Sequence, residues 1–195
     1  KTFGGVVSGC SMDAVDAVVE AFPQITEIES EELREQVVDA WGVAMEENDI
    51  HDLDEVYWFP PAQNALGIPD ENLVDHVREV IDGSMQLAEQ LRVSRDADVS
   101  VDIVTAGAVV HDVSKLYEFR GLETTELGEL LVHPHYGVAV TARVGLPVSV
   151  QHIVLSHSPQ TAVDPVTLEA EIVCRIDQIC GSAIRATADG GLRET

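Results

Sequence analysis

The sequence predicts an all-α protein, and three observations support this fold class. Apolar residues recur every three or four positions through most of the 195 residues, which is the spacing of one helix face. Serine or proline precedes several of these periodic segments, as expected at helix starts. No segment shows the strict alternation of an exposed β-strand; residues 99–104 come nearest, and their apolar continuation to 110 favours a helix.

The first part of the chain predicts a pair of helices followed by a loop. Ser11 can cap a first helix, and Ser30 precedes a second helix whose acidic first turn suits the positive end of the helix. Residues 48–70 lose the helical period and carry aromatic residues, prolines and a glycine, which predicts an ordered loop with aromatic anchors. We therefore expect residues 1–69 to form an N-terminal helical extension and loop, and residues 70–195 to form the main domain.

The main domain predicts a series of helices, most of them with a start or stop signal of their own. They are expected from Pro69 and Asp70, over about 100–113, over about 133–144 ending at Gly145, from Pro147 to about His157, and from Asp164 and Pro165 to about 187. A loop with Tyr117 and Phe119 follows the second of them. Their apolar faces predict a helical bundle with a buried core.

The composition excludes several classes of protein. Hydrophobic residues make up 45% of the chain, which is enough for a sizeable core and too many for a disordered chain. No apolar run approaches the roughly 20 residues that span a bilayer, and the start of the chain lacks the pattern of a signal peptide. We therefore expect a cytoplasmic protein without membrane contact. Three cysteines without C-x-x-C spacing predict buried thiols rather than disulfides.

The charge balance is strongly acidic, with 35 acidic residues, 11 basic residues and a formal net charge of −24. A surface this negative repels phosphate backbones, which excludes nucleic-acid binding through a basic patch. High acidity with almost no lysine supports the hypothesis of a halophilic source, where salt screens the self-repulsion; highest stability at low salt would contradict it. Most carboxylates are then expected at the solvated surface, so only those at special positions are candidates for chemistry.

The segment 106–115 carries the strongest chemical signal. A small, apolar helix ends there in adjacent His111 and Asp112, and an imidazole beside a carboxylate suits a divalent first-row metal. Neighbouring residues on a helix point about 100° apart, so one metal can contact both while the second oxygen of Asp112 reaches a neighbouring metal. Lys115 is the only lysine after residue 1. Its charge could neutralise a substrate phosphate or carboxylate, with a salt bridge to a nearby acid as the structural alternative.

Other candidate ligands lie on the inward faces of separate helices. His76, His133 and His157 each share a face with apolar residues, and Asp177 aligns with apolar positions of the last helix. Each such residue alone is more often a satisfied core group than a ligand. Together they are notable, because helical bundles build metal sites from polar side chains on facing helices.

Several other residues are weaker candidates. Three histidines lie off these faces and are expected at the surface or in supporting roles: His51, His135 and His152. Two arginines could contact an anionic substrate, with surface ion pairs as the alternative: Arg120 and Arg143. The aromatic residues Tyr57 and Trp58 are expected to pack the N-terminal helices, with closure over the site as the alternative.

Six of these residues match, in order, the H…HD…H…H…D pattern of the binuclear members of the HD superfamily: His76, His111, Asp112, His133, His157 and Asp177. The run Ala-Val-Val-His-Asp-Val-Ser-Lys is similar to the central signature of that family, and the resemblance covers about residues 70–187. It implies an HD-domain helical bundle with an additional N-terminal helical pair. Residues 1–69 do not resemble a family pattern.

The resemblance implies a metal-dependent phosphohydrolase with two divalent or mixed-valent metal ions, iron or manganese. The first metal would be held by His76, His111, Asp112 and Asp177, and the second by His133 and His157 with Asp112 bridging. Water activated between the metals would cleave a phosphate ester or anhydride, for instance in a nucleotide. Asp112 and Lys115 would be the catalytic residues.

Other functions remain as alternatives. Mixed-valent di-iron oxygenases that act on small polar substrates carry the same ligand order, and hydratase or lyase chemistry is a third option. A non-enzymatic module with a degenerate site is disfavoured, because none of the six ligands is missing. We expect a small anionic substrate, and a homodimer stays an open option.

Overall fold

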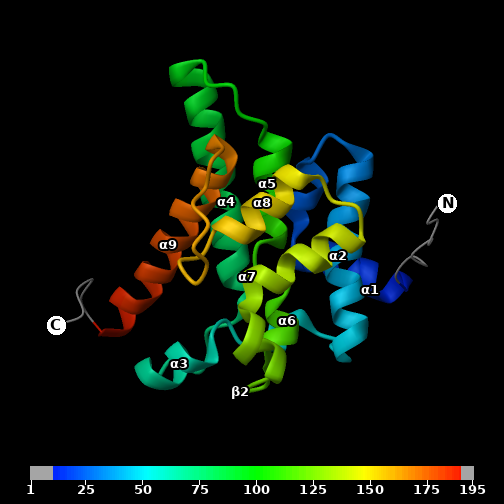
Figure 1. Ribbon diagram of the computed structural model, residues 1–195, viewed down its shortest axis with the longest axis vertical. Coiled ribbons are helices and arrows are strands. Elements are labelled where there is room, and N and C mark those ends of the chain that lie inside the picture. Colours follow the sequence, from blue (N-terminus) through cyan, green and yellow to red (C-terminus); the bar gives the residue numbers. More distant parts are fainter. Residues whose placement is uncertain (1–10, 190–195) are drawn as a thin grey trace.

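The computed structural model describes residues 11–189, and this part of the chain is built almost entirely of helices (Figure 1), which confirms the all-α fold class. The helices are α1 (Met12–Ala21), α2 (Glu31–Asn48), α3 (Pro60–Leu66), α4 (Leu73–Arg95), α5 (Val101–Val110), α6 (Lys115–Glu118), α7 (Glu126–Arg143), α8 (Val148–Ser156) and α9 (Leu168–Asp189). Two 3₁₀ turns, Pro23–Glu27 and Leu53–Glu55, and one antiparallel hairpin of β1 (Phe119–Arg120) and β2 (Glu123–Thr124) complete it. No helix in the described residues is long and apolar enough to cross a membrane.

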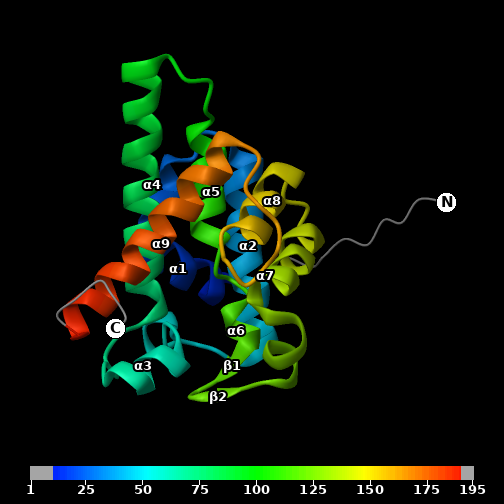
Figure 2. The same ribbon diagram turned by 60° about the vertical axis from the view of Figure 1, so that its left-hand side comes forward.

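Helix α5 lies at the centre of the bundle, in contact with α2, α4, α8 and α9. Figures 1 and 2 show α4 and α9 side by side along the long axis, with α7 and α8 beyond α5. One hydrophobic cluster runs through the bundle and includes residues of α1 and α2. The N-terminal helices therefore share a core with the rest of the chain, and the division between residues 69 and 70 stays a prediction.

The N-terminal helices begin at the predicted caps; α1 packs against α2, and α2 packs against α5. The hydroxyls of Ser11 and Ser30 each accept a hydrogen bond from the backbone N–H three residues later. Trp41 on α2 is fully buried, and its indole N–H donates to the carbonyl of Val109 on α5 at 3.0 Å. This bond holds α2 against the end of the helix that leads to His111.

Residues 48–70 were predicted to be a loop, and this prediction is wrong for part of the segment. They contain the 3₁₀ turn and helix α3, which begins at Pro60 and is followed by Gly67 with a φ of 70°. A proline at the first helical position lacks only an N–H that would be unpaired there anyway, so the prolines start this helix rather than break it. The loop predicted after α5 likewise contains α6 and the β1–β2 hairpin.

Three helix starts also differ from the predictions. Helices α4 and α9 begin after the prolines that were expected to open them, because the side chains of Asn72 and Thr167 accept hydrogen bonds from backbone N–H groups of the first turn. Helix α7 begins at Glu126, earlier than predicted, and is broken at Val132, whose φ of 50° is uncommon for a β-branched residue. The helix that was expected to start at His133 corresponds to the second half of this kinked helix.

The cysteine prediction is confirmed in part. Cys174 is a buried free thiol, as predicted, whereas Cys180 is a partly exposed free thiol. Cys10 lies outside the described residues.

Candidate metal centre

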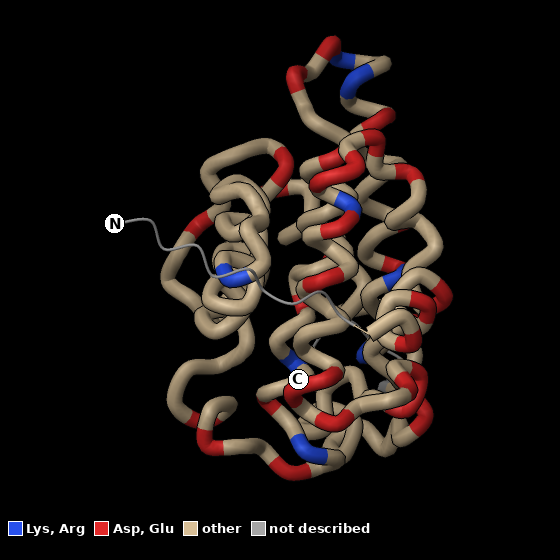
Figure 3. The backbone as a smooth tube through the Cα atoms, turned by 90° about the vertical axis from the view of Figure 1, so that its right-hand side faces the viewer, with Lys and Arg blue, Asp and Glu red and all other residues tan. Residues whose placement is uncertain are grey.

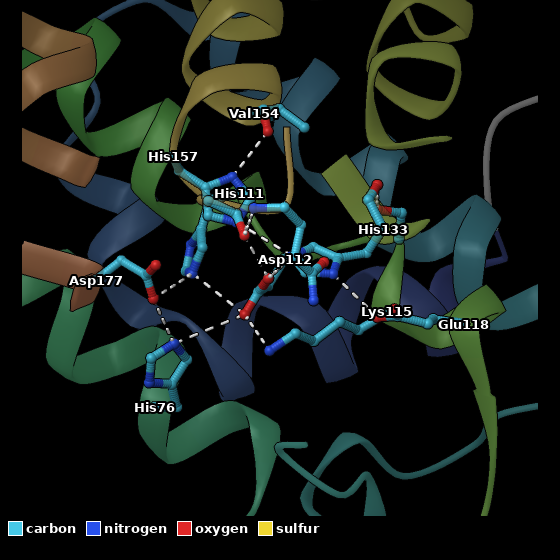
Figure 4. Close-up of polar contacts among 12 residues, drawn as sticks. His76, His111, Asp112, Lys115, Glu118, His133, Val154, His157 and Asp177 are labelled. Atoms are coloured by element: carbon cyan, nitrogen blue, oxygen red, sulfur yellow. Dashed lines mark hydrogen bonds and ion pairs between the residues drawn. The ribbon is translucent and has the colours of Figure 1, made fainter. Parts of the chain in front are cut away.

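The structure brings the six predicted metal-site residues together in the middle of the bundle (Figure 4). They come from five helices or their ends: His76 on α4, His111 and Asp112 after α5, His133 on α7, His157 after α8 and Asp177 on α9. Five of them are buried, and the side chain of Asp177 is 19% exposed. Its Oδ1 lies 3.0 Å from Nε2 of His76. We call these six residues the cluster.

Asp112 divides the cluster into two groups. Its Oδ2 lies 3.6 Å from Nε2 of His76 and 3.3 Å from Nε2 of His111. Its Oδ1 lies 3.3 Å from Nε2 of His133 and 3.5 Å from Nε2 of His157. One carboxylate therefore presents a separate oxygen to each pair of histidines, and it could bridge two ions.

Hydrogen bonds on the far side of two imidazole rings decide which nitrogen faces the centre. Nδ1 of His111 lies 2.7 Å from the carbonyl of Ala108, and Nδ1 of His157 lies 2.7 Å from the carbonyl of Val154. A carbonyl only accepts, so each Nδ1 carries the hydrogen and each Nε2 of the neutral ring presents a lone pair. Both histidines are the C-cap residues of their helices, so the acceptor is a carbonyl of the last turn.

Glu118 orients the ring of His133 in the same way, through a side chain. Its buried carboxylate accepts a hydrogen bond from Nδ1 of His133 at 3.0 Å. The kink at Val132 comes directly before His133, and the hydroxyl of Ser114 donates to the His133 carbonyl at 2.6 Å. Sequence reasoning missed Glu118; it lies one helical turn after Lys115, but nothing in that spacing indicates a contact with His133.

The centre of the cluster holds more lone pairs than hydrogens. Nε2 of His133 and Nε2 of His157 face each other at 3.3 Å, and neither can donate when both Nδ1 atoms carry the hydrogen. Nε2 of His111 and Oδ1 of Asp112 have no hydrogen-bond partner within residues 11–189. Buried polar atoms without a partner are costly, and a cation would satisfy all of them. Imidazole nitrogens and carboxylate oxygens together fit a divalent first-row metal.

The neighbouring charges keep both carboxylates ionised. Burial raises the pKa of Asp112, but the ammonium of Lys115, 2.8 Å from Oδ2, and the imidazole of His111 outweigh burial and hold that pKa well below its usual range. Burial also opposes ionisation of Asp177, yet hydrogen bonding and charge from the neighbouring imidazoles lower its pKa to about 2. Burial lowers the pKa of His133, which favours the neutral form that binds metals. At His111 burial acts in the same direction but is outweighed by the charge and the hydrogen bond of Asp112, so the pKa of His111 is raised. A bound cation would displace the proton that this favours.

The sequence left two roles open for Lys115, a substrate contact or a salt bridge to a nearby acid. The structure contains the salt bridge, and its partner is Asp112. The side chain is buried, with the ammonium 5.9 Å from the ring centre of Trp58 and 5.7 Å from that of Phe59. Because an ammonium carries three hydrogens, one contact with Asp112 leaves others available. Contact with a substrate stays a prediction.

A cavity of about 370 Å³ opens onto the cluster and is also lined by Lys115. We call its remaining lining residues the rim: residues 58–59, residues 158–160, and Gln178, Gly181, Ser182 and Arg185 of α9. Trp58 packs against the ring of His76, with 5.5 Å between ring centres. Trp58 therefore lies beside the cluster, whereas Tyr57 lines another cavity; closure of these residues over the site stays a prediction.

The weaker candidates lie outside the cluster. His51 and His135 are exposed, and His152 accepts a hydrogen bond from a backbone N–H. Arg143 forms an ion pair with a carboxylate of α2 at 2.8 Å. Arg120 lines a second cavity of about 600 Å³, which Lys115 also lines. Sequence reasoning missed Arg185, although it lies two helical turns beyond Asp177.

The HD domain family matches residues 73–181, a segment that covers more than half of the chain and contains the whole cluster. Neither the curated proteins nor the solved structures gave a match. The family match confirms the resemblance seen in the sequence: the chain belongs to the HD domain family.

Proposed function

We propose that this protein is a metal-dependent hydrolase that cleaves a phosphate ester or anhydride in a small anionic substrate. Asp112 carries the proposal, because its two oxygens face two different pairs of histidines. Metal-dependent phosphate hydrolysis is the general activity that the HD domain indicates. Paired metal positions are suited to in-line displacement at phosphorus.

The two groups of the cluster would hold the two metals. His76, His111 and Asp177 would hold the first with Oδ2 of Asp112, and His133 and His157 would hold the second with Oδ1. When bound, the metals would supply an activated water and stabilise charge on the phosphoryl oxygens. Iron or manganese, divalent or mixed-valent, fits this set of nitrogen and oxygen donors.

The side chains around the cluster would position the substrate. Asp112 would fix the spacing of the two metal positions. The ammonium of Lys115 would keep Asp112 ionised and would also donate a hydrogen bond to a phosphoryl oxygen in the cavity. In the reaction, the water oxygen forms a new bond to phosphorus and the bond to the leaving oxygen breaks. A proton of the water ends on the leaving group, so the products are phosphate and an alcohol or a second phosphate.

The test combines metal analysis with phosphate release on protein purified anaerobically in high salt. We expect about two metal ions per chain and release of phosphate from p-nitrophenyl phosphate or nucleotides that does not depend on oxygen. Asp112→Ala should lose both metals and the activity. His135→Ala is the matched control, because His135 is an exposed histidine of the same helix as His133, and it should retain both.

Two outcomes would overturn the proposal. Intact metal content and activity in Asp112→Ala would show that the site is wrongly assigned. Two irons with a coupled mixed-valent paramagnetic signal, and oxygen consumption in place of phosphate release, would favour the di-iron oxygenase instead.

A further inference from the structure

The rim of the cavity carries no acidic residue, unlike most of this acidic protein. Figure 3 shows acidic residues over most of the backbone, in keeping with 35 acidic against 11 basic residues, although residues 130–163 contain none. None of the rim residues that the structure describes is acidic; they are aromatic, amide, hydroxyl or small residues, with one cation, Arg185. An anion that approaches the cluster across this rim therefore meets no opposing carboxylate until it reaches the metal positions.

Arg185 is a cation without a carboxylate partner among the side chains described, those of residues 11–188. Its Nη1 donates to the carbonyl of Gly181 at 3.2 Å, and its guanidinium carbon lies 5.6 Å from the ring centre of Trp58. These contacts hold the side chain in place but leave its charge unneutralised. Four other arginines instead pair with carboxylates: Arg78, Arg92, Arg143 and Arg175.

The side chains of Lys115 and Arg185 both lie near the indole ring of Trp58. The Lys115 ammonium lies 5.9 Å from the ring centre of Trp58, and the Arg185 guanidinium carbon lies 5.6 Å from it. Lys115 sits beside the cluster and is paired with Asp112, whereas Arg185 sits on the rim and is unpaired. Their distances from the same ring centre place the two cations no more than about 12 Å apart, a separation that a small molecule with two anionic groups can span.

We infer that Arg185 binds a second anionic group, a carboxylate or a phosphate, on the part of the substrate that does not react. This inference rests on the proposed function for the reacting phosphoryl group beside Lys115. A guanidinium offers paired N–H groups that match either oxyanion. The cavity of about 370 Å³ lies near the lower end of the roughly 300–1,000 Å³ usual for ligand sites. The substrate class is therefore a small phosphate ester that carries a second oxyanion.

The experiment uses probes that bind without being hydrolysed. Straight-chain alkylphosphonates and ω-phosphonocarboxylates of matched and increasing length differ only in the terminal carboxylate. Their dissociation constants for the metal-loaded protein are measured by isothermal titration calorimetry without oxygen. At the best length we expect the carboxylate to tighten binding about 10-fold, the lower range for a hydrogen bond to a charged group. Arg185→Gln should abolish this preference, and Arg185→Lys should keep part of it.

Arg175→Gln is the matched control, because Arg175 lies on the same helix and is paired with Glu171 at 2.9 Å; it should keep the full preference. The inference is overturned if Arg185→Gln retains the wild-type preference, or if it weakens both series equally, which would place the reacting phosphonate on Arg185. No preference at any length would also overturn it.

Phosphate release from p-nitrophenyl phosphate and from nucleotides separates this inference from the proposed function. A carboxylate preference that depends on Arg185 in a protein that releases no phosphate supports the second anion site and overturns the hydrolase. Phosphate release without such a preference does the reverse.

Discussion

Replacing Gly137 with alanine tests whether the close packing of α7 and α8 determines the positions of the candidate ligands His133 and His157. A Cβ at this position would lie 2.5 Å from Cγ1 of Val154 and 3.0 Å from Oγ of Ser114. Carbon atoms in contact are about 3.5–4.0 Å apart, so α7 and α8 must separate by about 1 Å. Val154 supplies the carbonyl that orients His157, and Ser114 holds the carbonyl of His133. The substitution therefore moves two candidate ligands without altering either.

We expect Gly137→Ala to lower the free energy of unfolding of the metal-free protein by about 1–3 kcal/mol, as overpacking usually does. For a chain of this size that corresponds to a decrease in Tm of about 2–12 °C. The second metal should also bind more weakly, because His133 and His157 shift relative to Asp112. A displacement near 1 Å can cost about 100-fold in activity. Calorimetry of the metal-free protein measures the first effect, and metal titration measures the second.

A compensating substitution serves as the control. Val154→Ala removes the Cγ1 that the new methyl group would meet, so the double variant should bind the second metal more tightly than Gly137→Ala alone. The reasoning is refuted if Gly137→Ala unfolds at the wild-type temperature and binds the second metal with wild-type affinity.

Three further predictions concern the groups that support the centre. Glu118→Gln should weaken the second metal about 10- to 100-fold and spare the first, because a neutral amide polarises His133 less; equal losses in a competition titration would contradict this. Trp41→Phe should cost about 1 kcal/mol in chemical denaturation with unchanged metal content, because it removes the bond to the Val109 carbonyl. Chelation should lower Tm, since each ion at about 100 times its Kd stabilises by about 2.7 kcal/mol; an unchanged Tm would argue against bound metal.

The helices and the residues of the cluster were predictable because they leave a local trace in the sequence. Asp177 stands out as an acid on an apolar helix face in a chain whose other acids are mostly at the surface. His76 and His133 likewise interrupt apolar stripes, so their burial follows from the periodicity alone. Family resemblance then supplied the order that joins separate helices into one site.

The supporting residues could not be predicted, because their roles depend on tertiary contacts. Glu118 lies in a four-residue helix, which is too short to show a periodic face. Arg185 is an exposed residue of α9 whose position matters only because Trp58 packs beside it. The kink at Val132 did have a local signal, because Pro134 lies two residues after it inside α7 and a proline in a helix interior kinks or breaks the helix. Tertiary contacts, rather than residue type, determine the roles of Glu118 and Arg185.

The hydrogen bonds behind the imidazole rings differ in how well they would survive mutation. His111 and His157 are oriented by main-chain carbonyls, which no side-chain substitution at the acceptor can remove. His133 depends on the carboxylate of Glu118, which a single substitution deletes. Each proposed metal position thus contains one imidazole that the main chain orients, His111 in the first and His157 in the second. A single change at Glu118 would weaken the second position through His133 alone, while these two rings keep their orientation.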